Sequence, residues 1–120
     1  MVYVVDDDFS VRTALRRLLL SLGHPVRLFA SAEQFLASTD SGARGCLILD
    51  LMLPGMSGLE LQAQLTDEGW KLPVIFITAH DDAASRDAAL CANAVAYLSK
   101  PFGRDEVLSH VRHAMGSTYT

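Results

Sequence analysis

The residues of this chain that could do chemistry lie directly after short apolar runs. Three consecutive aspartates, residues 6–8, follow the first run, and Asp50 follows the third. Thr78 follows the apolar residues of the fourth run, and Lys100 comes after the fifth, immediately before a proline. Taken alone, each has an ordinary explanation, such as an acidic turn or a solvated lysine, because short motifs often match by accident. Their meaning depends on whether the fold brings them together.

A cluster of carboxylates would require a cation. If the first and third runs are neighbouring strands, Asp6, Asp7 and Asp50 converge on one small pocket. Two carboxylates about 4 Å apart repel each other by about 4 kcal/mol at an effective dielectric constant near 20. Oxygen ligands with room left for water and phosphate suit Mg²⁺ better than zinc or calcium. The sequence therefore predicts a Mg²⁺ pocket, with Mn²⁺ as the alternative ion.

Thr78 and Lys100 would complete a site for phosphoryl transfer. Such a site needs a metal, a cation and a hydroxyl around the three equatorial oxygens of the phosphoryl group. A carboxylate is already ionised at pH 7, so Asp50 can attack phosphorus without a general base.

The elements that must position these residues alternate along the chain. The five apolar runs are Val2–Val5, Val26–Phe29, Cys46–Leu49, Val74–Ile77 and Val95–Leu98. Most are aliphatic without polar alternation, which is typical of strands covered on both faces. Helical periodicity follows each run, and this order predicts a parallel sheet with helices on both sides. Ligands of such sheets bind beyond the carboxyl ends of the strands.

Local signals predict the ends of the helices. They are Ser10 as the N-cap and Gly23 as the end of the first helix, capping boxes at Ser31–Gln34 and Ser57–Glu60, and a fourth helix from about Asp82 to Ala92, ended by Asn93. In that fourth helix Leu90 is the one large aliphatic residue, and we expect it to be the anchor.

Composition indicates one small globular domain spanning residues 1–120. Half the residues are hydrophobic and 20% are charged, close to the average of soluble domains. The formal net charge of −4 argues against nucleic-acid binding by the domain as a whole. Cys46 and Cys91 form no CxxC pair, and we expect buried free thiols in a reducing compartment. With no apolar segment long enough to cross a membrane, the expected location is cytoplasmic.

Motifs in a fixed order resemble the receiver domain of two-component response regulators. The matching segments are Val4–Asp7, Leu49–Gly58, Ile77–Ala79 and Ala96–Phe102. The resemblance implies an α/β, flavodoxin-like (βα)5 three-layer sandwich with parallel strand order 2-1-3-4-5. The amino-acid sequence of these motifs is most similar to that of receivers of LuxR/FixJ-type transcriptional regulators, which precede a helix-turn-helix DNA-binding domain. Any such output domain lies outside these 120 residues.

The resemblance implies a role for each residue of the pocket. Asp50 would be the phosphoacceptor, charged from the phosphohistidine of a sensor histidine kinase. Asp7, Asp50 and the Met52 backbone carbonyl would ligate Mg²⁺ directly, while Asp6 would act largely through water. Lys100 would contact the phosphoryl oxygens.

The resemblance also implies a switch and a means of tuning it. Thr78 would swing toward the phosphate, Tyr97 would follow it inward, and the Lys100–Pro101 peptide bond would be cis. Met52 and His80 occupy positions that flank the path of the attacking water in the family. Because methionine cannot orient a water and His80 would partly shield it, we expect slow autodephosphorylation.

The implied function is a signalling switch and not a turnover enzyme. Its partners would be the kinase and an attached or separate output domain that binds DNA. Phosphorylation would change the surface of the fourth helix and fifth strand, where a homodimer would form. The domain itself would contact neither nucleic acid nor membrane.

Three other functions explain less of the sequence, and three positions depart from the family pattern. A pure interaction module would have lost this chemistry, but all the functional groups are present. A haloacid-dehalogenase-type phosphatase would use Asp6, but no later acidic strand end and no cap are present, and Asp50 would be unused. A flavin module needs a phosphate-binding loop after the first strand, where the acidic triplet repels phosphate. Leu53 replaces a usual Met and Asn93 a usual glycine, while Asp87 replaces an apolar residue and predicts weak packing of the fourth helix.

Overall fold

Five parallel strands form the centre of the molecule in the computed structural model, which describes residues 1–79, 82–92 and 94–116. The strands are β1 (Val2–Val5), β2 (Val26–Phe29), β3 (Cys46–Asp50), β4 (Val74–Thr78) and β5 (Ala96–Ser99). Neighbours pair in the order β2-β1-β3-β4-β5, and every pair is parallel. The predicted sheet order is confirmed.

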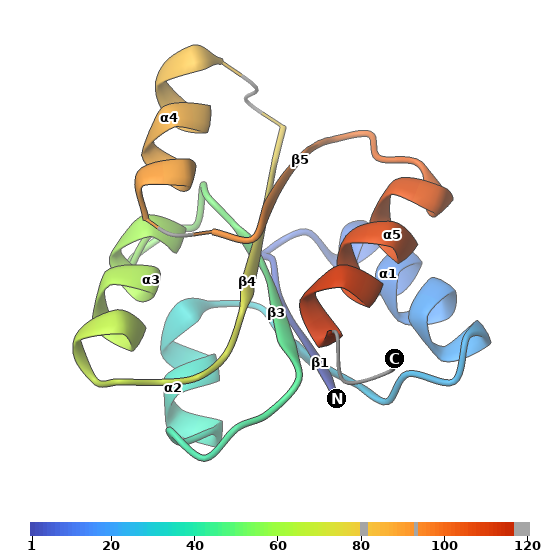
Figure 1. The fold of residues 1–120 in the computed structure, drawn as a ribbon, viewed down its shortest axis with the longest axis horizontal. Helices are drawn as coiled ribbons and strands as arrows, with labels where there is room; N and C mark the ends of the chain where they lie inside the picture. Colours follow the sequence, from blue (N-terminus) through green and yellow to red (C-terminus); the bar gives the residue numbers. More distant parts are fainter. Residues whose placement is uncertain (80–81, 93, 117–120) are drawn as a thin grey trace.

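Five helices cover the sheet on both faces. They are α1 (Phe9–Ser21), α2 (Ala32–Ser38), α3 (Gly58–Asp67), α4 (Ala83–Cys91) and α5 (Arg104–Met115). Helices α1 and α5 lie on one side, and α2, α3 and α4 lie on the other (Figure 1). The predicted three-layer sandwich is therefore confirmed. Among the described residues, no helix combines the length and the apolar character needed to cross a bilayer.

Alternation along the strands divides the core between the two faces. In β1, Val2 and Val4 pack with the α1 and α5 side, whereas Tyr3 and Val5 pack with the α2 and α3 side. Every residue of β1, β3 and β4 is buried because these strands have a neighbour on each edge and helices on each face. The edge strand β2 differs from the expected full burial, since Arg27 is exposed there.

The start of α1 corrects one prediction. Asp8 is its N-cap: its carboxylate accepts a hydrogen bond of 2.8 Å from the backbone N–H of Ser10, and the helix begins at Phe9. The expected cap, Ser10, lies inside the helix instead. Asp8, two residues earlier, takes the capping role because its carboxylate accepts from a free N–H of the first turn. At the other end, Gly23 with φ of 83° follows the helix as expected.

The two predicted capping boxes have different outcomes. Ser57 and Glu60 exchange both bonds, at 3.1 and 2.9 Å. Ser31 accepts from the Gln34 backbone, but the Gln34 side chain accepts from the N–H of Ala30 and not of Ser31. The Ser57–Glu60 box is confirmed, and the Ser31–Gln34 box is half formed.

Helix α4 runs as predicted but packs differently. Its cap is Asp82, yet its one buried residue is Ala89, while the expected anchor Leu90 is 54% exposed. The helix is turned so that an alanine faces the core, which leaves Cys91 exposed as well. The predicted burial of Cys91 is wrong, whereas Cys46 is buried as expected. The predicted end at Asn93 lies outside the described residues.

The two cysteines should differ sharply in reactivity. Burial raises the pKa of the Cys46 thiol to about 12, and its thiolate is therefore scarce at neutral pH. We expect a maleimide to label Cys91 within minutes in the native protein, and Cys46 only in denaturant. Mass spectrometry of wild type beside Cys91→Ser checks this. Rapid native labelling of the variant would contradict the buried position of Cys46.

Candidate functional site

The acidic pocket forms where β1 and β3 end side by side. Val5 pairs with Leu49, so Asp6 and Asp50 occupy the next position on each neighbouring chain segment. Asp6 is fully buried, Asp50 is 4% exposed, and Asp7 beside them is open to solvent. Carboxylate oxygens of these three residues all lie within 4.8 Å of one another. The predicted convergence of the three acids is therefore observed.

Lys100 bridges the two buried carboxylates. Its Nζ lies 2.8 Å from Oδ2 of Asp6 and 3.0 Å from Oδ2 of Asp50. The Lys100 backbone N–H also donates to the carbonyl of Thr78 at 2.8 Å, which holds the segment after β5 against the end of β4. The peptide bond between Lys100 and Pro101 is cis.

Backbone N–H groups orient the other oxygen of each buried acid. Oδ1 of Asp6 accepts from the N–H of Asp8 at 2.8 Å, and Oδ1 of Asp50 accepts from that of Met52 at 2.9 Å. Both are local side-chain to backbone bonds across two residues, a geometry that aspartate favours in turns. Each buried carboxylate thus has one oxygen fixed by its own turn and the other by the lysine.

The charges of the pocket do not balance. Burial raises the pKa of Asp50, as does the charge of Asp6, and the bonds from Met52 and Lys100 only partly offset this. Burial alone would lower the pKa of Lys100, but its bonds to the two acids outweigh that cost and the net pKa is raised. Three carboxylates against one ammonium leave an excess of two negative charges, which suits a divalent cation with oxygen ligands.

The remaining predicted residues lie around this pocket. Thr78 is buried and stands one residue past Ile77, which pairs with Asp50. Tyr97 is half-buried on β5, and the guanidinium carbon of Arg86 lies 5.5 Å from its ring centroid. The Met52 side chain is 57% exposed, although its N–H holds Asp50. His80 lies outside the described residues.

Three further residues support the site and were not singled out from the sequence. A Cβ at Gly58 would overlap the backbone carbonyl of Asp50, so only glycine fits where the capped start of α3 passes this strand end. Arg12 donates to the carbonyl of Asp6 at 2.7 Å, and Glu33 accepts from the N–H of Met56 at 2.9 Å. The glycine beside a capping box was a readable signal, whereas the two long-range bonds had none.

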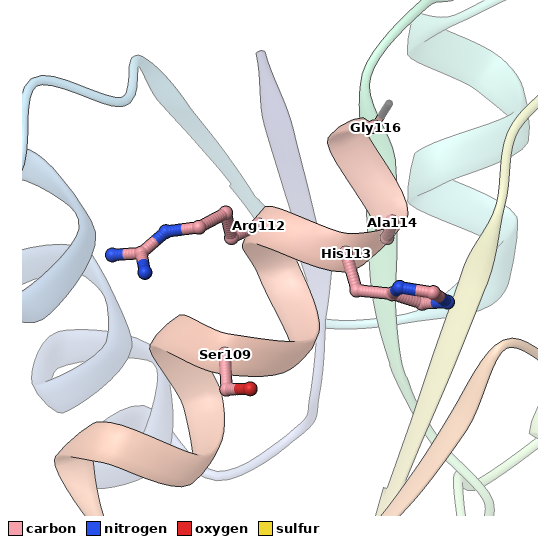
Figure 2. A pocket seen from close by; sticks show the side chains of 5 residues that line it. All are labelled: Ser109, Arg112, His113, Ala114 and Gly116. Atoms are coloured by element: carbon pink, nitrogen blue, oxygen red, sulfur yellow. The ribbon is translucent and has the colours of Figure 1, made fainter. Parts of the chain in front are cut away.

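A hollow at the far end of α5 is not part of the site. Its lining comes from one helix and the residue after it: Ser109, Arg112, His113, Ala114 and Gly116. Figure 2 shows that the Arg112 and His113 side chains extend in different directions from the helix. Helix α5 begins four residues after Lys100, and its last turn lies about 12 Å or more further along the helix axis at 1.5 Å per residue.

Comparison with known proteins identifies the family. The sequence model of the response regulator receiver domain matches residues 2–112. The response regulator protein TodT of Pseudomonas putida is 43% identical over 115 residues, which cover 96% of this chain and 51% of TodT. The transcriptional regulatory protein TdiR of Thauera aromatica is 41% identical over 114 residues, 95% of this chain and 50% of TdiR. The chain belongs to the response regulator receiver domain family.

A solved receiver structure has the same fold. The crystal structure of FixJ-N superimposes with a TM-score of 0.87 at 37% identity, covering 95% of this chain and 91% of that one. This receiver domain spans about half the length of the curated relatives it matches.

The raised pKa of Asp50 predicts a stabilising substitution. Because the folded-state pKa of this acid lies above its unfolded value, the free energy of unfolding falls as pH rises through the interval between them. Asp50→Asn removes that cost, and we expect a higher melting temperature at pH 7 without metal, by about 4 °C for each kcal/mol gained.

Calorimetry of Asp50→Asn at several pH values, with the exposed Asp67→Asn as the matched control, tests this expectation. The gain should shrink toward acid pH, where wild-type Asp50 is protonated in both states. A lower melting temperature for Asp50→Asn at pH 7 would show that the ion pair with Lys100 outweighs the burial of charge.

Proposed function

We propose that this receiver domain accepts a phosphoryl group on Asp50 from the phosphohistidine of a sensor histidine kinase. The observation that carries the proposal is the pairing of the buried Asp50 carboxylate with Lys100, 3.0 Å away, inside a cluster of acids. This arrangement supplies a nucleophile, a fixed cation and ligands for a divalent ion at one strand end. The domain acts as a switch and not as a turnover enzyme.

The transfer needs no general base. A carboxylate oxygen of Asp50 attacks phosphorus, the P–N bond to the kinase imidazole breaks, and its electron pair returns to the ring nitrogen. The Met52 N–H and the Lys100 ammonium hold the carboxylate in a fixed direction for this attack. Lys100 then pairs with the new phosphoryl oxygens and neutralises part of their charge.

Asp7, Asp50 and the Met52 carbonyl would hold Mg²⁺, and Asp6 would contribute through water. The open position of Asp7 and the two buried acids give this donor set both charge and access. When bound, the ion supplies charge neutralisation for the phosphoryl oxygens. Mn²⁺ fits the same oxygen donors.

The response runs from Thr78 to the surface of α4 and β5. The Thr78 hydroxyl moves toward the phosphoryl group, and Tyr97 moves inward. Thr78 and Tyr97 lie on neighbouring strands, because β4 pairs with β5 through Phe76 and Tyr97 and through Thr78 and Ser99. The changed surface forms a homodimer whose register is influenced by the charges of Arg86, Asp87 and Arg104, three exposed residues.

An output domain that binds DNA would be controlled by this dimer. Similarity to the transcriptional regulatory protein TdiR supports an output in transcription. Met52 and His80 set the lifetime of the phosphoryl group. The exposed, apolar Met52 side chain cannot orient an attacking water, and autodephosphorylation is therefore slow.

Phosphorylation can be tested directly. Incubation with acetyl phosphate and Mg²⁺ should give a shifted band on a Phos-tag gel for wild type and none for Asp50→Asn. Asp67→Asn, an exposed change on α3, should shift like wild type. A shift that survives in Asp50→Asn and disappears in Asp6→Asn would place the acyl phosphate on Asp6 and favour the phosphatase reading.

The ligand set predicts which acid the metal requires. Asp7→Ala should abolish Mg²⁺ binding, because it removes a ligand, whereas Asp8→Ala should leave it within about twofold. Asp8 caps α1 with its carboxylate and contributes none to the cluster of three. Chemical shifts of the residue 50–52 amides during MgCl₂ titration give the affinities. Equal losses in both variants would overturn the assignment of Asp7.

A further inference from the structure

We propose that Gln62 is a positioning residue that fixes the C-terminal end of α4 on α3, so that α4 responds as a lever from its N-terminal end. The lever rests on the switch proposed above. The fixed end rests on the contacts between α3 and α4 alone.

The amide of Gln62 makes a buried bond between two helices. Gln62 is only 7% exposed, and its Nε2 donates to the carbonyl of Ala92 at 2.9 Å. Glutamine is uncommon in protein interiors, where its polar atoms need partners. Ala92 is the C-cap of α4, and carbonyls at a helix C-terminus lack partners within the helix. One bond therefore satisfies a buried donor on α3 and an end carbonyl on α4.

Apolar packing also concentrates at this end of α4. Ala89 is buried in the core, and Ala92 and Ala94 pack against the same cluster. Just beyond, the N–H of Val95 donates to the Val74 carbonyl at 2.8 Å and joins the segment to the sheet. The C-terminal end is thus held by apolar packing, by the Gln62 bond and by the sheet.

The N-terminal half of α4 is more exposed than its C-terminal end. Ala83 and Ala84 are exposed, as are the capping residue Asp82 and Arg86, whose guanidinium lies over Tyr97. A cation–π contact at an exposed site contributes about 0.5–1 kcal/mol. In Figure 1 the first turn of α4 projects beyond the other helices, while its last turn lies beside α3.

This asymmetry determines where a change at the site enters the helix. Thr78 ends β4, and α4 begins at Ala83, so a movement of the threonine reaches the more exposed end of the helix first. Segments with few buried contacts open at the lowest free energy cost. A buried bond at the other end then converts this disturbance into a rotation about Ala92 and not a shift of the whole helix.

Two glutamines on α3 provide a matched test in the unphosphorylated protein. Gln62→Met removes the buried donor at similar volume. Gln64→Met removes an exposed side-chain bond to Glu68 of 3.0 Å on the same helix. We expect Gln62→Met to speed amide exchange at residues 88–92 about five- to thirtyfold and Gln64→Met to leave it unchanged, as measured by NMR. Equal exchange in the two variants would overturn the fixed end.

Beryllofluoride with Mg²⁺, a mimic of the phosphoryl group, tests the lever. In wild type and Gln64→Met, exchange should change at residues 83–87 and stay within about twofold at 88–92. In Gln62→Met the change should spread to 88–92. A uniform response along α4 in wild type would overturn the lever.

The two proposals fail in different ways. A response in no variant would reject the switch and the lever, while the comparison without beryllofluoride would still decide the fixed end. If Gln62→Met does not fold, as circular dichroism would show, Gln62→Asn replaces it. Its amide is one methylene too short to reach Ala92, and it should raise exchange at 88–92 in the same direction.

Discussion

An uncompensated group of charges at one end of the sheet governs this receiver domain. Carboxylate oxygens of the buried Asp6 and Asp50 and of the exposed Asp7 lie within 4.8 Å of one another. Lys100 neutralises only part of their charge. In a partly buried pocket such repulsion is far stronger than in water. A divalent cation, or removal of the charge of Asp50, would relieve this repulsion.

The topology makes this pocket unavoidable. Because β1 and β3 are neighbours in a parallel sheet, the residues that follow them emerge side by side, and β4 and β5 deliver Thr78 and Lys100 to the same edge. The helices on both faces of the sheet bury Asp6, Asp50 and Thr78 at this edge. Of the five helices, α4 buries the fewest residues, with Ala89 alone in the core.

The alternation of apolar runs with helical periodicity was enough to predict a parallel sheet with helices on both sides. The strand order came from the family resemblance, and the meeting of the three acids followed from that order. Helix α4 shows why other features were not predicted. Its many alanines leave no dominant apolar stripe, so the sequence does not reveal how the helix is turned about its axis, and Leu90 and Cys91 were misplaced. The contacts of Arg12 and Gln62 join segments whose approach depends on the complete tertiary structure. The family resemblance supplied the roles of individual residues, which geometry alone does not assign.

The most direct measurement of the charge imbalance is the free energy of unfolding as a function of MgCl₂ concentration, by urea denaturation at constant ionic strength. A folded state that binds one Mg²⁺ should gain about 1.4 kcal/mol for each tenfold rise above the dissociation constant, and Asp7→Ala should lose this gain. Sodium chloride in place of MgCl₂ should have no such effect. A free energy of unfolding that does not change with Mg²⁺, or that rises equally with sodium, would contradict the account.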